Sequence, residues 1–181
     1  MKREDLLKAG HYEIHGETIA KFEFFQNGFN PYSRYLDVDK VDLILRKKEN
    51  GKVRFVEVQV KYGTLYKVDK DWYRDKFSCH SWKFFKLDEF KDAPKDLYIA
   101  YVLSLPNDYK GDIFVIPVTK FNDLIKSAVK SETKKGGTKA KFMIAHDHRQ
   151  DKWFVCTQSK FQDNDFSNGI DVTKYRRNFK L

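Results

Sequence analysis

The fold of this chain is decided by residues 53–62, which read Val-Arg-Phe-Val-Glu-Val-Gln-Val-Lys-Tyr. Apolar and polar residues alternate there, and this alternation predicts a β-strand whose successive side chains point to opposite faces. One face is a ladder of valines at positions 56, 58 and 60. The other face turns polar at Glu57, Gln59 and Lys61. An acid, an amide and a cation in a row, backed by a buried valine ladder, make a poor core and a good reaction surface.

A second predicted strand, residues 41–46, precedes this one, and Asn50-Gly51 lies between the two. Asn-Gly is the strongest short signal for a two-residue type I′ hairpin turn. With these two residues as the loop, Asp42 falls opposite Gln59. Directly opposed residues share a face of the sheet, so the hairpin predicts one polar patch. Its members are Asp42, Glu57, Gln59 and Lys61.

Two alternatives to a functional patch stay open. Solvated polar residues on one face of a half-exposed hairpin would produce the same alternation. A slip of one residue in the strand pairing would place Asp42 opposite Val58 or Val60 instead.

The rest of the chain predicts an α/β fold with a central mixed β-sheet flanked by helices. Residues 14–26 predict a helix that buries a stripe of Ile14, Thr18, Phe22 and Phe25, with Glu17 at the edge of the stripe. Further strands are expected at 97–102 and 112–116, followed by a helix with Thr119 as its N-cap. Residues 142–145 and 153–155 predict a closing hairpin, and residues 66–90 predict helical or irregular cover.

The composition favours a polyanionic partner. The chain has 181 residues, which predicts a single domain over residues 1–181, and its formal net charge is +9. Lysine and arginine release counterions from phosphates, although an anionic membrane or solubility alone would also suit this charge. The two cysteines provide no disulfide framework, and there is neither a signal peptide nor a run long enough to cross a bilayer. We therefore expect a cytoplasmic protein with no membrane partner.

The order of these motifs resembles the PD-(D/E)xK nuclease superfamily, which has the restriction-endonuclease-like fold. The resemblance rests on Glu17 in a helix, Asp42 in a strand and Gln59-Val60-Lys61 in the next strand. It covers a core of about residues 10–120 and leaves 121–181 as a C-terminal elaboration. Gln59 stands where the family usually has Asp or Glu, and Glu57 or Glu17 could restore the missing charge.

The resemblance implies a metal-dependent endonuclease that hydrolyses DNA phosphodiester bonds as a homodimer, on duplex or branched DNA. The implied cofactor is Mg²⁺, with Mn²⁺ as the alternative ion. Asp42 would be the central ligand, Gln59 a neutral second ligand, and Glu17 a ligand directly or through water. Lys61 would orient or deprotonate the attacking water. The glutamine also leaves open a catalytically inactive nuclease-fold module that binds nucleic acid, and an RNA-directed enzyme is a third interpretation.

Basic and aromatic residues interleave between positions 66 and 86, a pattern that can follow a phosphate backbone or stack bases. We expect the aromatics to belong to the core and the cations to contact nucleic acid. The expected nucleic-acid contacts are Lys67, Lys70, Arg74, Lys134 and Lys135. Arg176-Arg177 near the C-terminus is interpreted first as solvated charge. The histidines show no four-ligand spacing typical of structural zinc.

Overall fold

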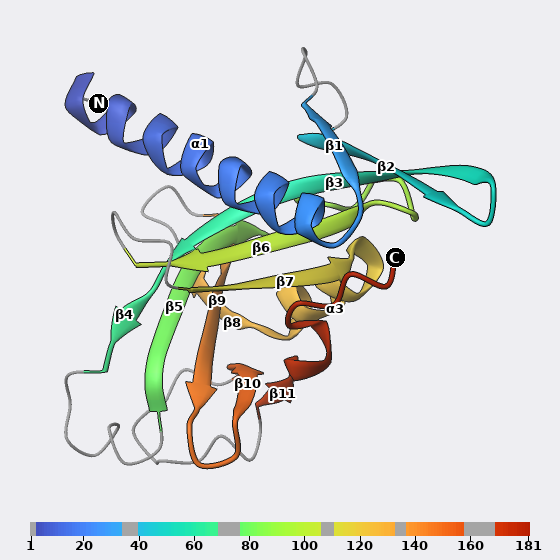
Figure 1. Ribbon diagram of the computed structural model, residues 1–181. Coiled ribbons are helices and arrows are strands. Elements are labelled where there is room, and N and C mark those ends of the chain that lie inside the picture. The colour runs from blue at the N-terminus through green and yellow to red at the C-terminus, as the bar shows by residue number, and fades with distance from the viewer. Residues whose placement is uncertain (1–2, 34–39, 69–76, 106–110, 133–136, 158–168) are drawn as a thin grey trace.

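The computed structural model describes residues 3–33, 40–68, 77–105, 111–132, 137–157 and 169–181. Figure 1 shows three layers. A long helix, α1 (Arg3–Gln26), covers one face of sheet A, and sheet B together with a short helix, α3 (Val118–Ser127), covers the other. The expected α/β class, a mixed sheet flanked by helices, is confirmed.

Sheet A has the strand order β1-β2-β3-β6-β7, in which β3 and β6 are parallel and all other neighbours are antiparallel. Its strands are β1 (Asn30–Ser33), β2 (Leu43–Glu49), β3 (Lys52–Thr64), β6 (Tyr98–Ser104) and β7 (Gly111–Pro117). The near-continuous apolar run of β7 predicts burial on both faces, and residues 113–116 are each at most 2% exposed.

Sheet B has the order β11-β10-β9-β5-β4, and β8 pairs with β9 outside this path. Its strands are β4 (Tyr66–Lys67), β5 (Phe77–Lys86), β8 (Val129–Glu132), β9 (Thr138–Asp147), β10 (Lys152–Val155) and β11 (Ile170–Asp171). The prediction of helical or irregular cover at 66–90 is wrong for β4 and β5. Aromatic residues lie on both faces of β5, so apolar and polar residues do not alternate along its sequence. The closing hairpin is confirmed as β9 and β10.

Helix α1 buries a different face from the predicted one. Ile19, Ala20 and Phe24 pack on sheet A, whereas Ile14 and Phe25 are 69% and 66% exposed. The helical period is compatible with either face. Small residues decide between them, because Gly16 lets the helix approach β3 so closely that an added Cβ would lie 3.0 Å from the Tyr62 Cβ.

Two further features complete the helices. α3 begins at Val118 directly after Pro117, and no side chain caps it, so the predicted Thr119 N-cap is wrong. The chain ends in a short 3₁₀ helix, η2 (Thr173–Tyr175). No helix in the described ranges combines the length and apolar character that crossing a membrane requires.

The two sheets meet where β3 leaves sheet A. Gly63 lies against β5 and β6, and a Cβ there would come within 2.6 Å of the Tyr101 Oη and 2.7 Å of the Ser81 Oγ. A glycine is therefore required at this crossing. The crossing brings side chains of β5 next to the polar face of β3, where the candidate site lies.

Candidate active site

The β2–β3 hairpin has the predicted turn and register. Asn50 and Gly51 have φ values of 49° and 79°, as a type I′ turn demands. The ladder pairs Glu49 with Lys52 and Leu43 with Val58. The paired ladder ends at Leu43, and Asp42, one residue before β2, donates its backbone N–H to the Val58 carbonyl at 3.0 Å.

Beyond this point β2 no longer pairs with β3, and two side chains take its place. The Val60 N–H donates to the Asp42 Oδ2 at 2.6 Å, and the Tyr62 carbonyl accepts a hydrogen bond from the Lys83 Nζ at 3.1 Å. Buried backbone groups must be paired, so these contacts satisfy the edge of β3. They also fix the Asp42 carboxylate and the Lys83 amine beside β3.

Gln59 lies on the face of β3 opposite the valine ladder. The valines belong to the core under α1, whereas Gln59 pairs with Ile99 of β6, which belongs to the core between the sheets. The Gln59 side chain is 6% exposed, and its oxygen has no hydrogen-bond donor within the described residues. An unsatisfied buried acceptor is rare in proteins, so this oxygen is the strongest sign of a ligand position in the patch.

Lys61 lies on the same face, two residues further along β3. Its Nζ pairs with the Glu89 Oε1 at 3.4 Å, and both side chains are largely buried. Glu89 also accepts a hydrogen bond from the Lys86 backbone N–H at 3.2 Å through its other oxygen, and its carbonyl contacts Lys40. The Glu89 carboxylate therefore fixes the Lys61 amine, and the Lys86 backbone N–H fixes that carboxylate.

Lys83 adds a second amine, and sequence reasoning did not place it in the patch. Burial lowers the pKa of the Lys83 amine, and the nearby Lys61 lowers it further. Only the crossing of β3 and β5 brings these two lysines together, and no local spacing could have shown it. Local spacing could not have shown that Glu89 lies beside Lys61 either.

The three acidic residues of the prediction do not form a cluster. Glu57 lies opposite Ile44 on the face of Gln59, while Glu17 on α1 forms an ion pair with Lys21 at 3.7 Å. Within the described part of the chain no three His, Cys, Asp or Glu side chains are arranged to hold a metal ion. A metal here would use the Asp42 carboxylate and the Gln59 amide oxygen, with water as its remaining ligands.

A shallow depression of about 410 Å³ opens beside the Lys61–Glu89 pair and is lined by Lys40, Lys86, Asp88 and Glu89. Of the predicted nucleic-acid contacts, Lys67 is exposed on β4. The other four, Lys70, Arg74, Lys134 and Lys135, lie outside the described residues.

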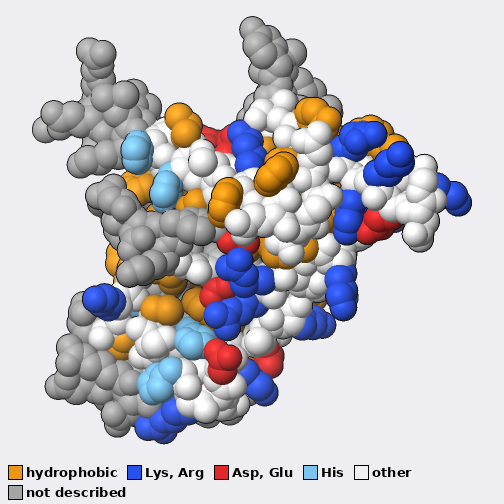
Figure 2. Space-filling view, in the orientation of Figure 1, with side chains coloured by type: hydrophobic (Ala, Val, Ile, Leu, Met, Phe, Trp, Pro, Cys, Tyr) orange, Lys and Arg blue, Asp and Glu red, His pale blue; other side chains and the backbone are white. Residues whose placement is uncertain are grey.

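The tip of the β2–β3 hairpin is a basic surface that sequence reasoning missed. Figure 2 shows Lys and Arg side chains gathered there, and Figure 1 shows the hairpin reaching beyond the rest of sheet A. The cations are Arg46, Lys47, Lys48, Lys52 and Arg54. The signal was visible in the sequence as a charge cluster around Asn50-Gly51.

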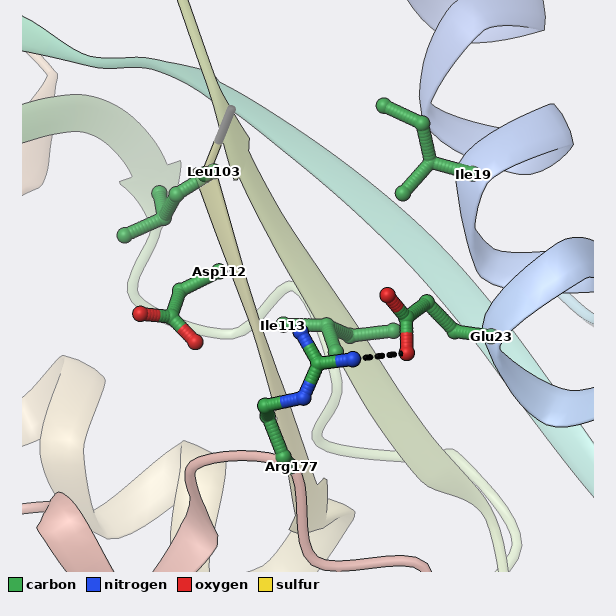
Figure 3. A pocket seen from close by; sticks show the side chains of 7 residues that line it. Ile19, Glu23, Leu103, Asp112, Ile113 and Arg177 are labelled. Atoms are coloured by element: carbon green, nitrogen blue, oxygen red, sulfur yellow. Dashed lines mark hydrogen bonds and ion pairs between the residues drawn. The ribbon is translucent and has the colours of Figure 1, made fainter. Parts of the chain in front are cut away.

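A second pocket, of about 130 Å³, lies between α1, β6, β7 and the C-terminal segment (Figure 3). Glu23, only 3% exposed, pairs there with Arg177 at 2.6 Å, and Asp112 pairs with Arg176 at 2.9 Å. Both arginines are therefore ion-paired, although Arg177 is also exposed to solvent as expected. They tie the C-terminal segment to sheet A and α1, so this pocket is explained by a structural role.

Comparison of the chain with protein-family models, with curated proteins and with solved structures found no match. The assignment of an activity therefore rests on the residues and geometry of the site itself.

Proposed function

We propose that this protein is a metal-dependent endonuclease that hydrolyses phosphodiester bonds in DNA, of the PD-(D/E)xK type that its sequence resembles. One observation carries the proposal. The buried Gln59 oxygen lacks a donor among the described residues, on the face of β3 that bears Lys61 and one residue from the Val60 N–H that donates to Asp42. A cation bound by this oxygen would remove the penalty of leaving a buried acceptor unpaired.

The donors at this place suit a hard dication. Carboxylate and amide oxygens are the ligands of Mg²⁺, which keeps several of its waters, and Mn²⁺ accepts the same donors. Asp42 and Gln59 would hold the ion with water as its remaining ligands, whereas the expected ligand Glu17 lies on α1, which covers the valine face of β3. When bound, the ion supplies charge stabilisation at the phosphate and makes its bound water more acidic.

The chain's own residues provide orientation and positive charge. The Val60 N–H fixes the Asp42 carboxylate, and Glu89 fixes the Lys61 amine at 3.4 Å. Lys61 can donate to the attacking water or to a non-bridging phosphate oxygen. Lys83 places a second cation nearby, so the patch favours the developing charge of a phosphoryl-transfer transition state.

The expected substrate is duplex or branched DNA. A net charge of +9 and the basic tip of the β2–β3 hairpin favour a polyanion, because each phosphate contact releases counterions. A homodimer is the expected assembly, since the family that the sequence resembles cuts two strands. Sedimentation equilibrium of the purified protein tests this point directly.

A second function is favoured by a specific observation. Among the described residues, no group of three His, Cys, Asp or Glu side chains is arranged to hold a metal ion, and Lys61 is held in an ion pair with Glu89. Both features suit a nuclease-like module that binds nucleic acid without cutting it. Calorimetric titration with Mg²⁺ separates the two proposals, because the inactive module should bind DNA yet show no Mg²⁺ site.

The deciding experiment is a cleavage assay on linear, nicked and four-way-junction DNA, with Mg²⁺ and with EDTA. We expect metal-dependent cleavage that falls at least about 100-fold in Lys61→Ala, within the range typical of a lost proton-transfer or charge-stabilising group. Lys120→Ala is the matched control, because Lys120 is an exposed lysine of α3. A structured RNA in the same buffer tests the RNA-directed alternative.

Cleavage in EDTA, or full activity of Lys61→Ala, would overturn the proposed mechanism. Loss of activity in Lys120→Ala to the same degree would show that overall charge, rather than the site, is being measured.

A further inference from the structure

The strand β5 presents two aromatic rings to solvent on the outer face of sheet B. Trp82 and Phe84 are each 42% exposed, and their ring centroids lie 5.6 Å apart at an interplanar angle of 75°. Residues two apart on a strand share a face. Their inward neighbour Phe85 is 1% exposed and packs in the core between the sheets, so β5 separates its aromatics by face.

Exposed rings at adjacent same-face positions are unusual. Burial of an aromatic side chain stabilises a fold strongly, and the inner face of sheet B shows that this chain does bury its rings there. Neighbouring exposed apolar groups mark interaction surfaces more often than isolated ones do. The pair therefore suits a partner with flat apolar groups.

The charges around the rings are positive. Lys86 lies directly opposite Lys139, and Lys141 lies opposite Phe84 with its Nζ 5.7 Å from the centre of the Trp82 ring. Like charges directly opposite each other destabilise a sheet. Among the described residues on this face of β5, β8 and β9, the only carboxylate is that of Asp147, which is buried and accepts hydrogen bonds from backbone N–H groups. Asp88 and Glu89 follow β5 and line a depression with Lys86.

We propose that this face, formed by Trp82, Phe84, Lys86, Lys139 and Lys141, binds an unpaired nucleic-acid strand. Bases stack on the two rings, and phosphates neutralise the three lysines, which relieves the repulsion between Lys86 and Lys139. Aromatic platforms flanked by cations bind single strands without sequence preference. The site shares Lys86 with the depression beside the Lys61–Glu89 pair, but its two rings lie on sheet B, away from Asp42, and binding there does not depend on catalysis.

The test uses the full chain in EDTA and fluorescence anisotropy with a short labelled oligothymidylate. Trp82→Leu and Phe84→Leu should each weaken binding by roughly 5- to 100-fold, the range found when one stacking ring is removed. Trp82→Phe should retain most of the affinity. Phe25→Leu is the matched control, because Phe25 is 66% exposed on α1, and it should bind as the unmodified protein does.

Lys141→Gln should flatten the dependence of log affinity on log salt by about 0.7 for the phosphate contact that is lost. An oligouridylate in parallel shows whether RNA or DNA is preferred, and Asp42→Asn should bind as tightly as the unmodified protein. Circular dichroism melting of each variant establishes that it is folded.

Three results would overturn the proposal. Unchanged affinity in both leucine variants would exclude stacking. An equal loss in Phe25→Leu would show that any exposed ring matters. A change of oligomeric state in the leucine variants, with oligonucleotide affinity intact, would assign the face to contact between copies of the chain.

Discussion

Two substitutions of Asp42 should separate its structural contact from its chemistry. The Asp42 Oδ2 accepts a hydrogen bond from the Val60 N–H at 2.6 Å, at the edge of β3 where β2 has ended. Asp42→Asn would keep an oxygen that can accept this bond but would remove the negative charge. Asp42→Ala removes both. We therefore expect Asp42→Asn to fold well and fail in cleavage, whereas Asp42→Ala fails in cleavage and is also less stable.

The magnitudes follow from the contact. Hydrogen bonds to charged groups contribute about 1.5–3 kcal/mol and neutral ones about 0.5–1.5 kcal/mol. Asp42→Asn should thus lower the free energy of unfolding by about 1 kcal/mol. Asp42→Ala leaves a backbone donor of β3 unpaired and should lower it by about 2–3 kcal/mol. For a chain of this size, a change of about 1 kcal/mol shifts the Tm by roughly 2–4 °C.

Urea unfolding followed by circular dichroism measures both stabilities, and the DNA cleavage assay with Mg²⁺ measures activity. Equal destabilisation by asparagine and alanine would refute the role assigned to the Val60 contact. Cleavage by Asp42→Asn at the unmodified rate would refute the proposal that the Asp42 carboxylate holds the metal.

Three further predictions concern the framework around the site. Arg177→Met should destabilise the protein by about 2–3 kcal/mol, because it leaves the buried Glu23 carboxylate without its ion pair to Arg177. A double-mutant cycle with Glu23→Gln, measured by urea unfolding, should show a coupling energy of about 0.5–3 kcal/mol. Additive effects would contradict a stabilising interaction between Arg177 and Glu23. Gly63→Ala should lower the free energy of unfolding by about 1–3 kcal/mol, since the new methyl group would overlap the Tyr101 hydroxyl. A Tm equal to that of the unmodified protein would count against the close approach of the two sheets. The pKa of Lys83 is lowered in the folded state from its ordinary value near 10.5, so between the two values the unfolded chain binds more protons and stability rises with pH. Unfolding measured at increasing pH below the ordinary lysine pKa of about 10.5 should show this rise. Lys83→Met should reduce the slope, and an unchanged slope would argue against burial of the amine.

Local sequence signals predicted the hairpin and much of the patch. Asn50-Gly51 selects one turn type, the turn sets the register, and the register pairs Leu43 with Val58, next to Asp42. Each step involves neighbours along the chain or directly paired strands. Alternation alone also put Lys61 on the face of Gln59.

The same reasoning failed where two solutions were locally equivalent. The period of α1 allows either of two apolar faces, and the fit of Gly16 against Tyr62 chose the one that leaves Phe25 exposed. In β5 the rings lie on both faces, so polarity does not alternate and the strand was misread as cover.

The sequence by itself determined the β2–β3 hairpin, its register and the face shared by Gln59 and Lys61, because turn geometry and strand period act between near neighbours. Only the tertiary structure decided that Glu89 holds Lys61, that Lys83 joins it, and that Arg177 ties down the C-terminal segment. These contacts join residues far apart in the chain. They depend on how two sheets and a helix pack, which local periodicity does not specify.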